Sequence, residues 1–154
     1  MKTPPLISMS LKRCKELWPN NACEKVERWN QYGRGGLGVR QDLFGFADIF
    51  CDGPDGTFYI QVTTKNCLTQ RFKKITGRDT RDKEPEDVRQ YRGDCVKSVL
   101  GGAGRILVWA WHQPDGKGTR WVLEEREVKP VDCVWDSRSS GHLDGTSDDT
   151  AVQE

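Results

Sequence analysis

Apolar residues recur at helical spacing in three segments of the chain. The first predicted helix begins at Thr3-Pro4-Pro5, which offers an N-cap followed by proline, and it ends before Pro19. A short basic helix is predicted over Asn66 to Ile75 and a long one over Pro85 to Leu100. Their expected buried faces are, in chain order, Ile7, Leu11, Cys14 and Trp18; Leu68, Phe72 and Ile75; and Val88, Tyr91, Cys95 and Val99.

Runs rich in β-branched and aromatic residues predict strands between these helices. The predicted strands are Ala22 to Trp29, Phe44 to Cys51, Thr57 to Thr63, Arg105 to Trp111 and Thr119 to Leu123. Pro54-Asp55-Gly56 favours a hairpin between the second and third strands. The order of elements predicts a three-layer-like α/β sandwich, a central mixed β-sheet of about five strands flanked by helices.

Length and charge indicate one domain followed by a tail. The 154 residues suit a single core, which we place at residues 1–136. Ser137 to Glu154 is polar and acidic, without periodicity, and is expected to be disordered. The glycine-rich stretch Tyr32 to Gly38 is expected to be a flexible connection, and the charge-dense stretch Gly77 to Glu86 is expected to bury little and to be mobile.

The six cysteines do not have the spacing of a zinc site. None forms a CxxC pair, and the two histidines are far apart in sequence. We therefore expect free thiols in a reducing cytosol. No apolar run approaches the ~20 residues of a membrane span, so a soluble, cytoplasmic protein is expected.

The segment Gly38 to Lys65 carries the residues best suited to chemistry. Asp48 offers a carboxylate on the first strand of the predicted hairpin, and Gln61 offers an amide oxygen on the second. Thr63, and Lys65 if the strand stays extended, point to the same side as Gln61 because side chains alternate along a strand. Oxygen ligands of this kind suit Mg²⁺, which neutralises charge on a phosphate and activates the attacking water.

The chain has a predicted helix and strand, then GFADIF, a turn and FYIQVTTK. In this order it resembles the restriction-endonuclease-like PD-(D/E)XK superfamily. It is most similar to small nuclease-like proteins encoded by bacteriophages, with a layout like that of archaeal-type Holliday junction resolvases. By position, Asp48 matches the metal-binding aspartate, Gln61 stands where the superfamily has Asp or Glu, and Thr63 stands where it has the catalytic lysine. Glu27, or as a second choice Glu16, matches the additional N-terminal acid.

The resemblance implies an endonuclease, a hydrolase that acts on DNA and depends on Mg²⁺ or Mn²⁺. It also implies a location in the host cytoplasm if the protein is phage-encoded, and a homodimer is one option. Two signature positions depart from the pattern, since Gln61 is neutral and Thr63 carries no charge. Lys65, one strand repeat further on, is our preferred replacement for the missing lysine. The alternatives are a catalytically inactive nuclease fold that binds DNA or a host protein, and a purely structural interaction module.

Several residues keep two interpretations. Asp42 is either a second metal ligand or the end of a loop. No acid lies between Thr57 and Arg78, so basic residues there suit phosphate contacts or a solvated face. The candidates for nucleic-acid contact are Arg40, Arg71, Lys73 and Lys74, and three tryptophans that either stack on bases or belong to the core are Trp109, Trp111 and Trp121.

Overall fold

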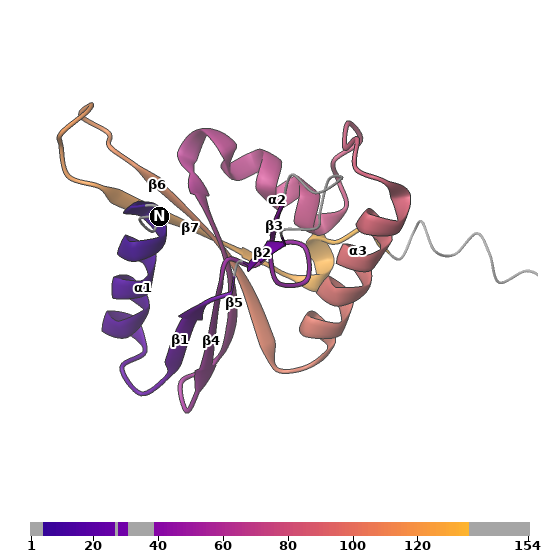
Figure 1. The fold of residues 1–154 in the computed structure, drawn as a ribbon, viewed down its shortest axis with the longest axis horizontal. Coiled ribbons are helices and arrows are strands. Elements are labelled where there is room, and N and C mark those ends of the chain that lie inside the picture. The colour runs from indigo at the N-terminus through magenta and orange to yellow at the C-terminus, as the bar shows by residue number, and fades with distance from the viewer. Residues whose placement is uncertain (1–4, 27, 31–38, 136–154) are drawn as a thin grey trace, which may run out of the picture.

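The computed structural model describes residues 5–26, 28–30 and 39–135 (Figure 1). Five strands form one mixed sheet in the order β1-β4-β5-β6-β7, and β2 and β3 form a separate two-stranded sheet. Within the large sheet β5 and β6 run parallel, and the other neighbouring strands run antiparallel. The strands are β1 Ala22–Lys25, β2 Arg28–Asn30, β3 Val39–Gln41, β4 Ile49–Gly53, β5 Gly56–Thr64, β6 Gly104–His112 and β7 Val122–Val128.

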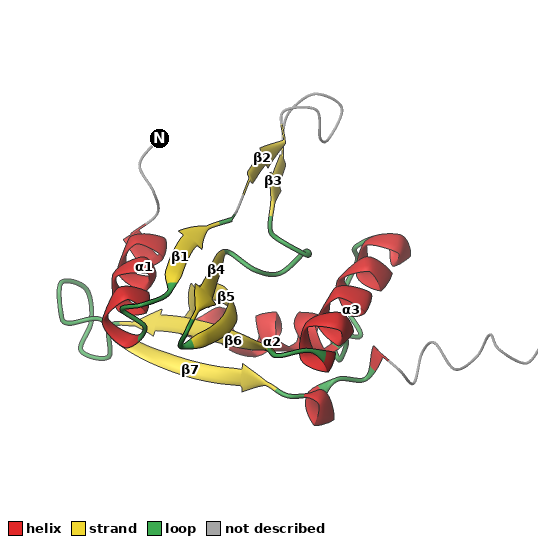
Figure 2. Cartoon of the chain, turned by 90° about the horizontal axis from the view of Figure 1, so that it is seen from below, coloured by secondary structure: helices red, strands yellow, loops and turns green. Residues whose placement is uncertain are grey.

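Helices cover both faces of the sheet (Figures 1 and 2). α1 (Pro5–Leu17) packs with Cys14 against one face, whereas α2 (Leu68–Thr76) and α3 (Glu86–Gly101) pack against the other. Among the described residues, two 3-10 helices lie at Lys65–Cys67 (η1) and Pro130–Asp132 (η2). The predicted α/β sandwich with a mixed five-stranded sheet and flanking helices is confirmed.

Strand β6 lies between β5 and β7 and is buried on both faces, in keeping with its run of apolar residues. Ile106 and Val108 face α2 and α3, and Leu107 and Trp109 face α1. Trp109 and Trp111 are buried, so the base-stacking interpretation is wrong for both of them. Trp121, at 38% exposure, remains open to it.

Three predicted strand boundaries are wrong. The strand predicted over Ala22 to Trp29 is split, because β1 pairs with β4 whereas β2 pairs with β3. The strand predicted from Phe44 begins only at Ile49, since Phe44 and Gly45 adopt left-handed backbone angles, φ 58° and 78°, in a turn. The last strand runs from Val122 to Val128 rather than from Thr119, because the turn after β6 is longer than predicted.

The buried face of α3 differs from the predicted stripe. Val88 and Tyr91 are exposed, whereas Arg92, Gly93, Val96 and Val99 are buried. The stripe at positions 92, 96 and 99 has the same helical spacing as the predicted one but begins with an arginine. The hydrophobic pattern did not predict this stripe, because its first residue is charged.

Arg92 is the centre of a buried ion-pair network. Its side chain is 5% exposed and contacts Asp82, which is 4% exposed, with Nη1 3.3 Å from Oδ2. Nη2 also pairs with Glu84, and Nε donates to the Gly45 carbonyl oxygen at 3.0 Å. The prediction that little in the loop after α2 is buried is therefore wrong for Asp82, because an ion pair compensates the burial of its charge.

The expectation of six free thiols is also wrong. Cys23 of β1 and Cys51 of β4 lie directly opposite each other and form a disulfide. Cys14, Cys67 and Cys95 keep free thiols. The sequence could not reveal this pair, because it depends on the register between β1 and β4.

Several expectations concern residues outside those that the structure describes. These are the start of the first helix at Thr3-Pro4, the glycine-rich connection from Tyr32 and the tail from Ser137. In the described part of the chain, no helix combines the length and apolarity needed to cross a membrane.

Replacing Gly93 with alanine should destabilise the fold by ~1–3 kcal/mol, although alanine favours helix formation. A Cβ at this position would lie 2.6 and 2.7 Å from atoms of the Trp135 ring. That ring is buried and held in place, since its Nε1 donates to the Ile75 carbonyl oxygen at 2.7 Å.

The measurement is urea unfolding of the full chain. Gly101→Ala is the matched control, because a Cβ at this last position of α3 has no atom within 4 Å. We expect the control to be as stable as the wild type or slightly more stable. A Gly93→Ala variant of wild-type stability would contradict the packing described for Trp135.

Candidate functional site

The register between β4 and β5 brings Asp48 and Gln61 together. Ile49 pairs with Ile60, and the Asp48 backbone N–H donates to the Ile60 carbonyl oxygen at 2.9 Å. Asp48 is thereby opposite Gln61, and cross-strand neighbours of this kind present their side chains on the same face. The turn at Gly53 and Gly56 fixes this register at the other end of the hairpin.

The Asp48 carboxylate is buried, at 7% exposure of the residue, and hydrogen-bonded. Its Oδ2 accepts from Gln61 Nε2 at 2.6 Å and from the Val62 backbone N–H at 2.8 Å. Gln61 is 5% exposed, and its Nε2 lies 3.4 Å from the Val62 carbonyl oxygen. One carboxylate, one amide and one backbone carbonyl are therefore gathered at the end of the β4–β5 pair.

Asp42 lies on the other side of a tight turn from Asp48. Leu43 and Ala47 form an isolated antiparallel bridge, with Leu43 N–H donating to the Ala47 carbonyl at 2.9 Å and the reverse bond at 2.9 Å. Asp42 and Asp48 are the next positions outward from this bridge. Asp42 and Asp48 therefore flank the turn on its two sides, and their roles as metal ligands stay predictions.

Arg92 holds this turn in place and was missed by the sequence analysis. Its Nε donates to the Gly45 carbonyl, three residues before Asp48. The signal that could have identified it is its place on the stripe with Val96 and Val99, where a charged side chain requires a buried partner.

Thr63 shares the Gln61 face, as predicted, and is buried. Lys65 does not follow it as an extended strand residue, because β5 ends at Thr64 and Lys65 begins η1. Its side chain is 55% exposed, and Nζ lies 3.9 Å from Glu124 Oε2 on β7. The premise that an extended strand carries the Lys65 amine beside Asp48 is wrong.

The additional acid predicted near the N-terminus is not identified by the structure. Glu27 lies outside the described residues. Glu16, the second choice, lies on α1, which covers the sheet face opposite to Gln61, and it pairs with Arg13 at 3.2 Å. Glu16 is therefore separated from the Asp48 site by the sheet.

The three predicted nucleic-acid contacts on α2 do not share one face of the helix. Arg71 and Lys74 are neighbours on α2, but Lys73 points elsewhere because successive helix residues are rotated by about 100°. Lys74 pairs with Glu84 at 3.1 Å. Arg40 lies in β3, and its side chain is not described.

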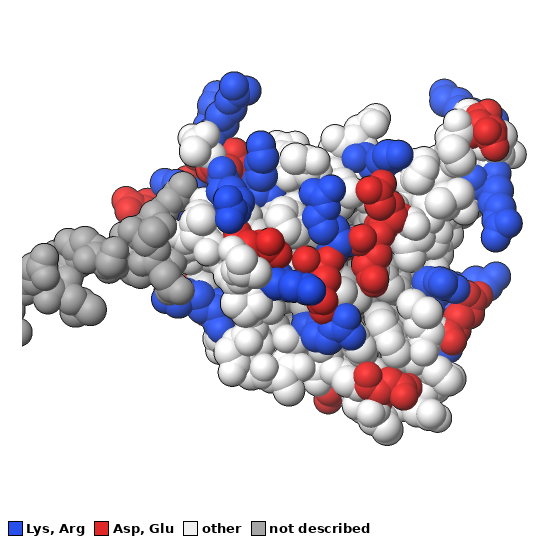
Figure 3. Space-filling model, turned by 180° about the vertical axis from the view of Figure 1, so that it is seen from behind, with Lys and Arg blue, Asp and Glu red and all other residues white. Residues whose placement is uncertain are grey.

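Basic and acidic side chains are interspersed on the face seen from behind (Figure 3). A single basic field, which would attract a polyanion over a long distance, is not a feature of that face. Contact with nucleic acid there would depend on individual Lys and Arg side chains.

Tyr59 lies two residues before Gln61 on the same strand. Burial raises the pKa of its hydroxyl, and the negative charge of Asp52 adds to the rise. Tyr59 is therefore a neutral phenol at physiological pH, and its ring packs against Phe44 and Phe46 of the turn.

The donor set at Asp48 fits a hard divalent cation. Mg²⁺ in proteins is commonly bound by one or two carboxylates and retains several waters. Asp48 supplies the carboxylate, and the Val62 carbonyl supplies a neutral oxygen next to it. Gln61 presents its nitrogen to Asp48, so its amide must rotate by half a turn before its oxygen serves as a ligand.

Replacing Gln61 with glutamate should make stability depend on divalent metal. Without metal, a second carboxylate would replace an amide nitrogen that is 2.6 Å from Asp48 Oδ2. Two buried carboxylates in contact repel, and the hydrogen bond is lost, at a cost of ~1–3 kcal/mol. Added Mg²⁺ should reverse this loss.

Thermal unfolding in EDTA and in Mg²⁺ measures the effect. Gln61→Met is the control of similar size, because it loses the hydrogen bond without gaining a ligand. The metal-site assignment fails if Mg²⁺ raises the melting temperature of Gln61→Glu no more than it raises that of Gln61→Met.

Comparison with known proteins found no matching family model, no matching curated protein and no matching solved structure. The resemblance to the PD-(D/E)XK superfamily therefore remains a prediction from the residues between Arg40 and Lys65.

Proposed function

We propose that this protein is a divalent-metal-dependent hydrolase of nucleic-acid phosphodiester bonds, with DNA as its substrate. The observation that carries the proposal is the direct contact between the Asp48 carboxylate and the Gln61 amide across β4 and β5. Both side chains lie on one face, beside the Val62 carbonyl. Had they been on opposite faces of the sheet, no single ion could have contacted both.

In this proposal Asp48, the Gln61 amide oxygen and the Val62 carbonyl hold Mg²⁺ or Mn²⁺, and Asp42 is the nearest further acid along the turn. Bound metal supplies charge neutralisation at the phosphate and a more acidic water. Burial of Asp48 strengthens its interaction with a cation, because the local dielectric is lower than that of water. Thr63 adds a hydroxyl one strand repeat from Gln61, ~6.5 Å along the strand.

A second candidate function is a catalytically inactive nuclease fold that binds nucleic acid. Two observations favour it: Gln61 donates its amide N–H to Asp48, and the Lys65 amine lies next to Glu124. The hydrogen bond from Gln61 satisfies the Asp48 carboxylate without a metal ion. The Lys65 amine, which was predicted to be catalytic, is directed toward Glu124 instead of Asp48. In this alternative the Asp48–Gln61 pair stabilises the sheet.

The deciding experiment incubates the full chain with plasmid and branched DNA in Mg²⁺ or Mn²⁺, and then with EDTA. Metal-dependent products that disappear in EDTA support the hydrolase. Binding that weakens with salt, without products, supports the inactive binder, because salt competes for phosphate contacts. An RNA of the same sequence, run in parallel, tests the preference for DNA.

A further inference from the structure

Three cysteine sulfurs converge on the sheet face opposite to the candidate hydrolase site. Cys14 of α1, Cys23 of β1 and Cys51 of β4 have Sγ atoms that all lie within 4.8 Å of one another. Three different elements contribute them, and Cys14 and Cys51 are fully buried. Cys23 is partly exposed, so the cluster has one side open to solvent.

We propose that the reduced protein binds one thiophilic d10 metal ion, of the zinc(II) or copper(I) class, between Cys14, Cys23 and Cys51. Three sulfur ligands with metal–sulfur bonds of ~2.3 Å stand ~4 Å apart around an ion. The three sulfurs lie within 4.8 Å of one another, which is within 1 Å of the sulfur–sulfur distance around a bound ion. Thiolate sulfur is the ligand type that such ions prefer over carboxylate oxygen.

The surroundings favour a fixed site. Trp18 stacks on Phe58 with ring centroids 3.9 Å apart, and on Trp109 at 5.9 Å, within the same apolar cluster as the sulfurs. The register between β1 and β4 places Cys23 opposite Cys51. These contacts hold the three elements in place around the sulfurs.

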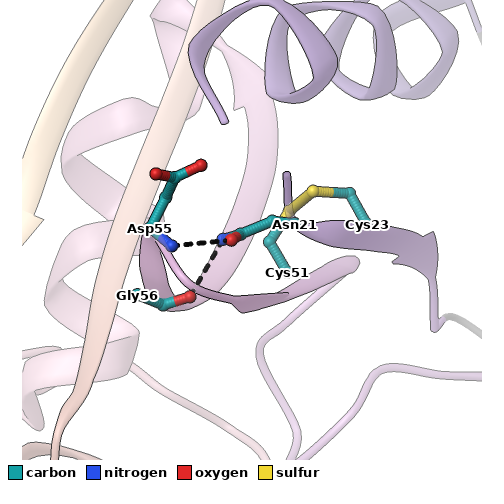
Figure 4. Close-up of a disulfide and its surroundings, with 5 residues drawn as sticks. All are labelled: Asn21, Cys23, Cys51, Asp55 and Gly56. Atoms are coloured by element: carbon teal, nitrogen blue, oxygen red, sulfur yellow. Dashed lines mark hydrogen bonds between the residues drawn. A yellow bond between two sulfur atoms is a disulfide. The ribbon is translucent and has the colours of Figure 1, made fainter. Parts of the chain in front are cut away.

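The turn beside the cluster is fixed as well (Figure 4). Asn21, two residues before Cys23, donates from Nδ2 to the Gly56 carbonyl at 2.9 Å and accepts from the Asp55 N–H at 3.0 Å. The start of β1 is thereby attached to the β4–β5 turn. The spacing between Cys23 and Cys51 consequently does not depend on the disulfide alone.

The disulfide makes the site dependent on oxidation state. On oxidation, the Cys23 and Cys51 thiolates give two electrons to a small-molecule disulfide and form their own S–S bond. The small disulfide takes up two protons and leaves as two thiols, and the metal ion is released. A dithiol reductant reverses the reaction by returning two electrons, which restores three sulfur ligands.

Burial raises the pKa of the Cys14 thiol to about 12. Without metal, Cys14 therefore remains a protonated thiol at physiological pH. Binding of a metal ion must displace this proton, as is general for cysteine ligands.

The test uses Cd²⁺ as the probe, because its bonds to thiolate give an ultraviolet charge-transfer band. Reduced full-length protein should bind one Cd²⁺ per chain at this site, and Cys14→Ala should weaken binding at least ~tenfold. Cys67→Ala and Cys95→Ala are matched controls, since both thiols lie outside the cluster. Competition with Zn²⁺ and with Cu⁺ then identifies the class of ion.

A measurement on the wild type alone keeps the proposal testable if Cys14→Ala does not fold. Treatment with oxidised glutathione should abolish Cd²⁺ binding, and reduction of the same sample should restore it. The proposal is overturned if Cd²⁺ binds the oxidised protein or the Cys14→Ala variant as tightly as the reduced wild type. It is also overturned if neither Zn²⁺ nor Cu⁺ displaces Cd²⁺.

Discussion

Replacing Arg92 with methionine should destabilise the fold by roughly 3–5 kcal/mol, because it removes the only cationic partner that the described contacts give the buried Asp82 carboxylate. Asp82 and Glu84 both pair with Arg92, so its loss leaves two acids near each other without their shared guanidinium. The Gly45 carbonyl also loses the donor at 3.0 Å. Methionine fills a similar length but offers no hydrogen bond.

Urea unfolding compared with that of Arg13→Met measures this effect. Arg13 pairs with Glu16 at 3.2 Å, but both side chains are about half exposed, at 45% and 51%. An exposed pair of this kind is worth ~0–1 kcal/mol. Equal losses in the two variants would contradict the assignment of Arg92 as the centre of a buried network.

Replacing Asp48 with asparagine should reduce metal-dependent cleavage of DNA by at least ~100-fold, since even residues that only support a metal ligand contribute 10–100-fold. In the wild type the Val62 N–H donates to Asp48 Oδ2 at 2.8 Å. Asparagine keeps an oxygen that can accept this hydrogen bond, but it has no negative charge to attract a cation. The fold should therefore survive, which circular dichroism and thermal unfolding check.

Asp52→Asn is the matched control for Asp48→Asn. Asp52 lies on β4, the strand that begins directly after Asp48, is exposed, and accepts from Thr57 Oγ1 at 2.6 Å. Its variant should cleave as the wild type does. The hydrolase account is wrong if Asp48→Asn cleaves within tenfold of the wild type and remains equally sensitive to EDTA.

The parts of the fold that local pattern determines were predictable. The apolar run from Arg105 to Trp111 predicted strand β6, and the spacing of Ile7, Leu11 and Cys14 predicted the amphipathic helix α1. The turn between Gly53 and Gly56 predicted the hairpin, and its register placed Asp48 opposite Gln61. Adjacent strands joined by a short turn leave little freedom in that register.

The remaining features depend on contacts between distant segments. Thr64 ends β5 before Lys65, so the alternation that gave Lys65 its predicted direction stops one residue too early. The Cys23–Cys51 bond depends on the register between β1 and β4. The burial of Arg92 depends on its ion pair with Asp82, which lies in a loop predicted to be solvated because it is dense in charge. Pattern analysis of one segment at a time contains none of this information.

The most direct test of the central claim, that Asp48 and Gln61 belong to one cation site, is paramagnetic broadening by Mn²⁺ of the backbone amide resonances of the full-length protein. The account predicts that the amides of Asp48, Val62 and Thr63 broaden first, and that Asp48→Asn abolishes this local effect. Broadening centred instead on Asp82 and Glu84, or none at Val62, would contradict it.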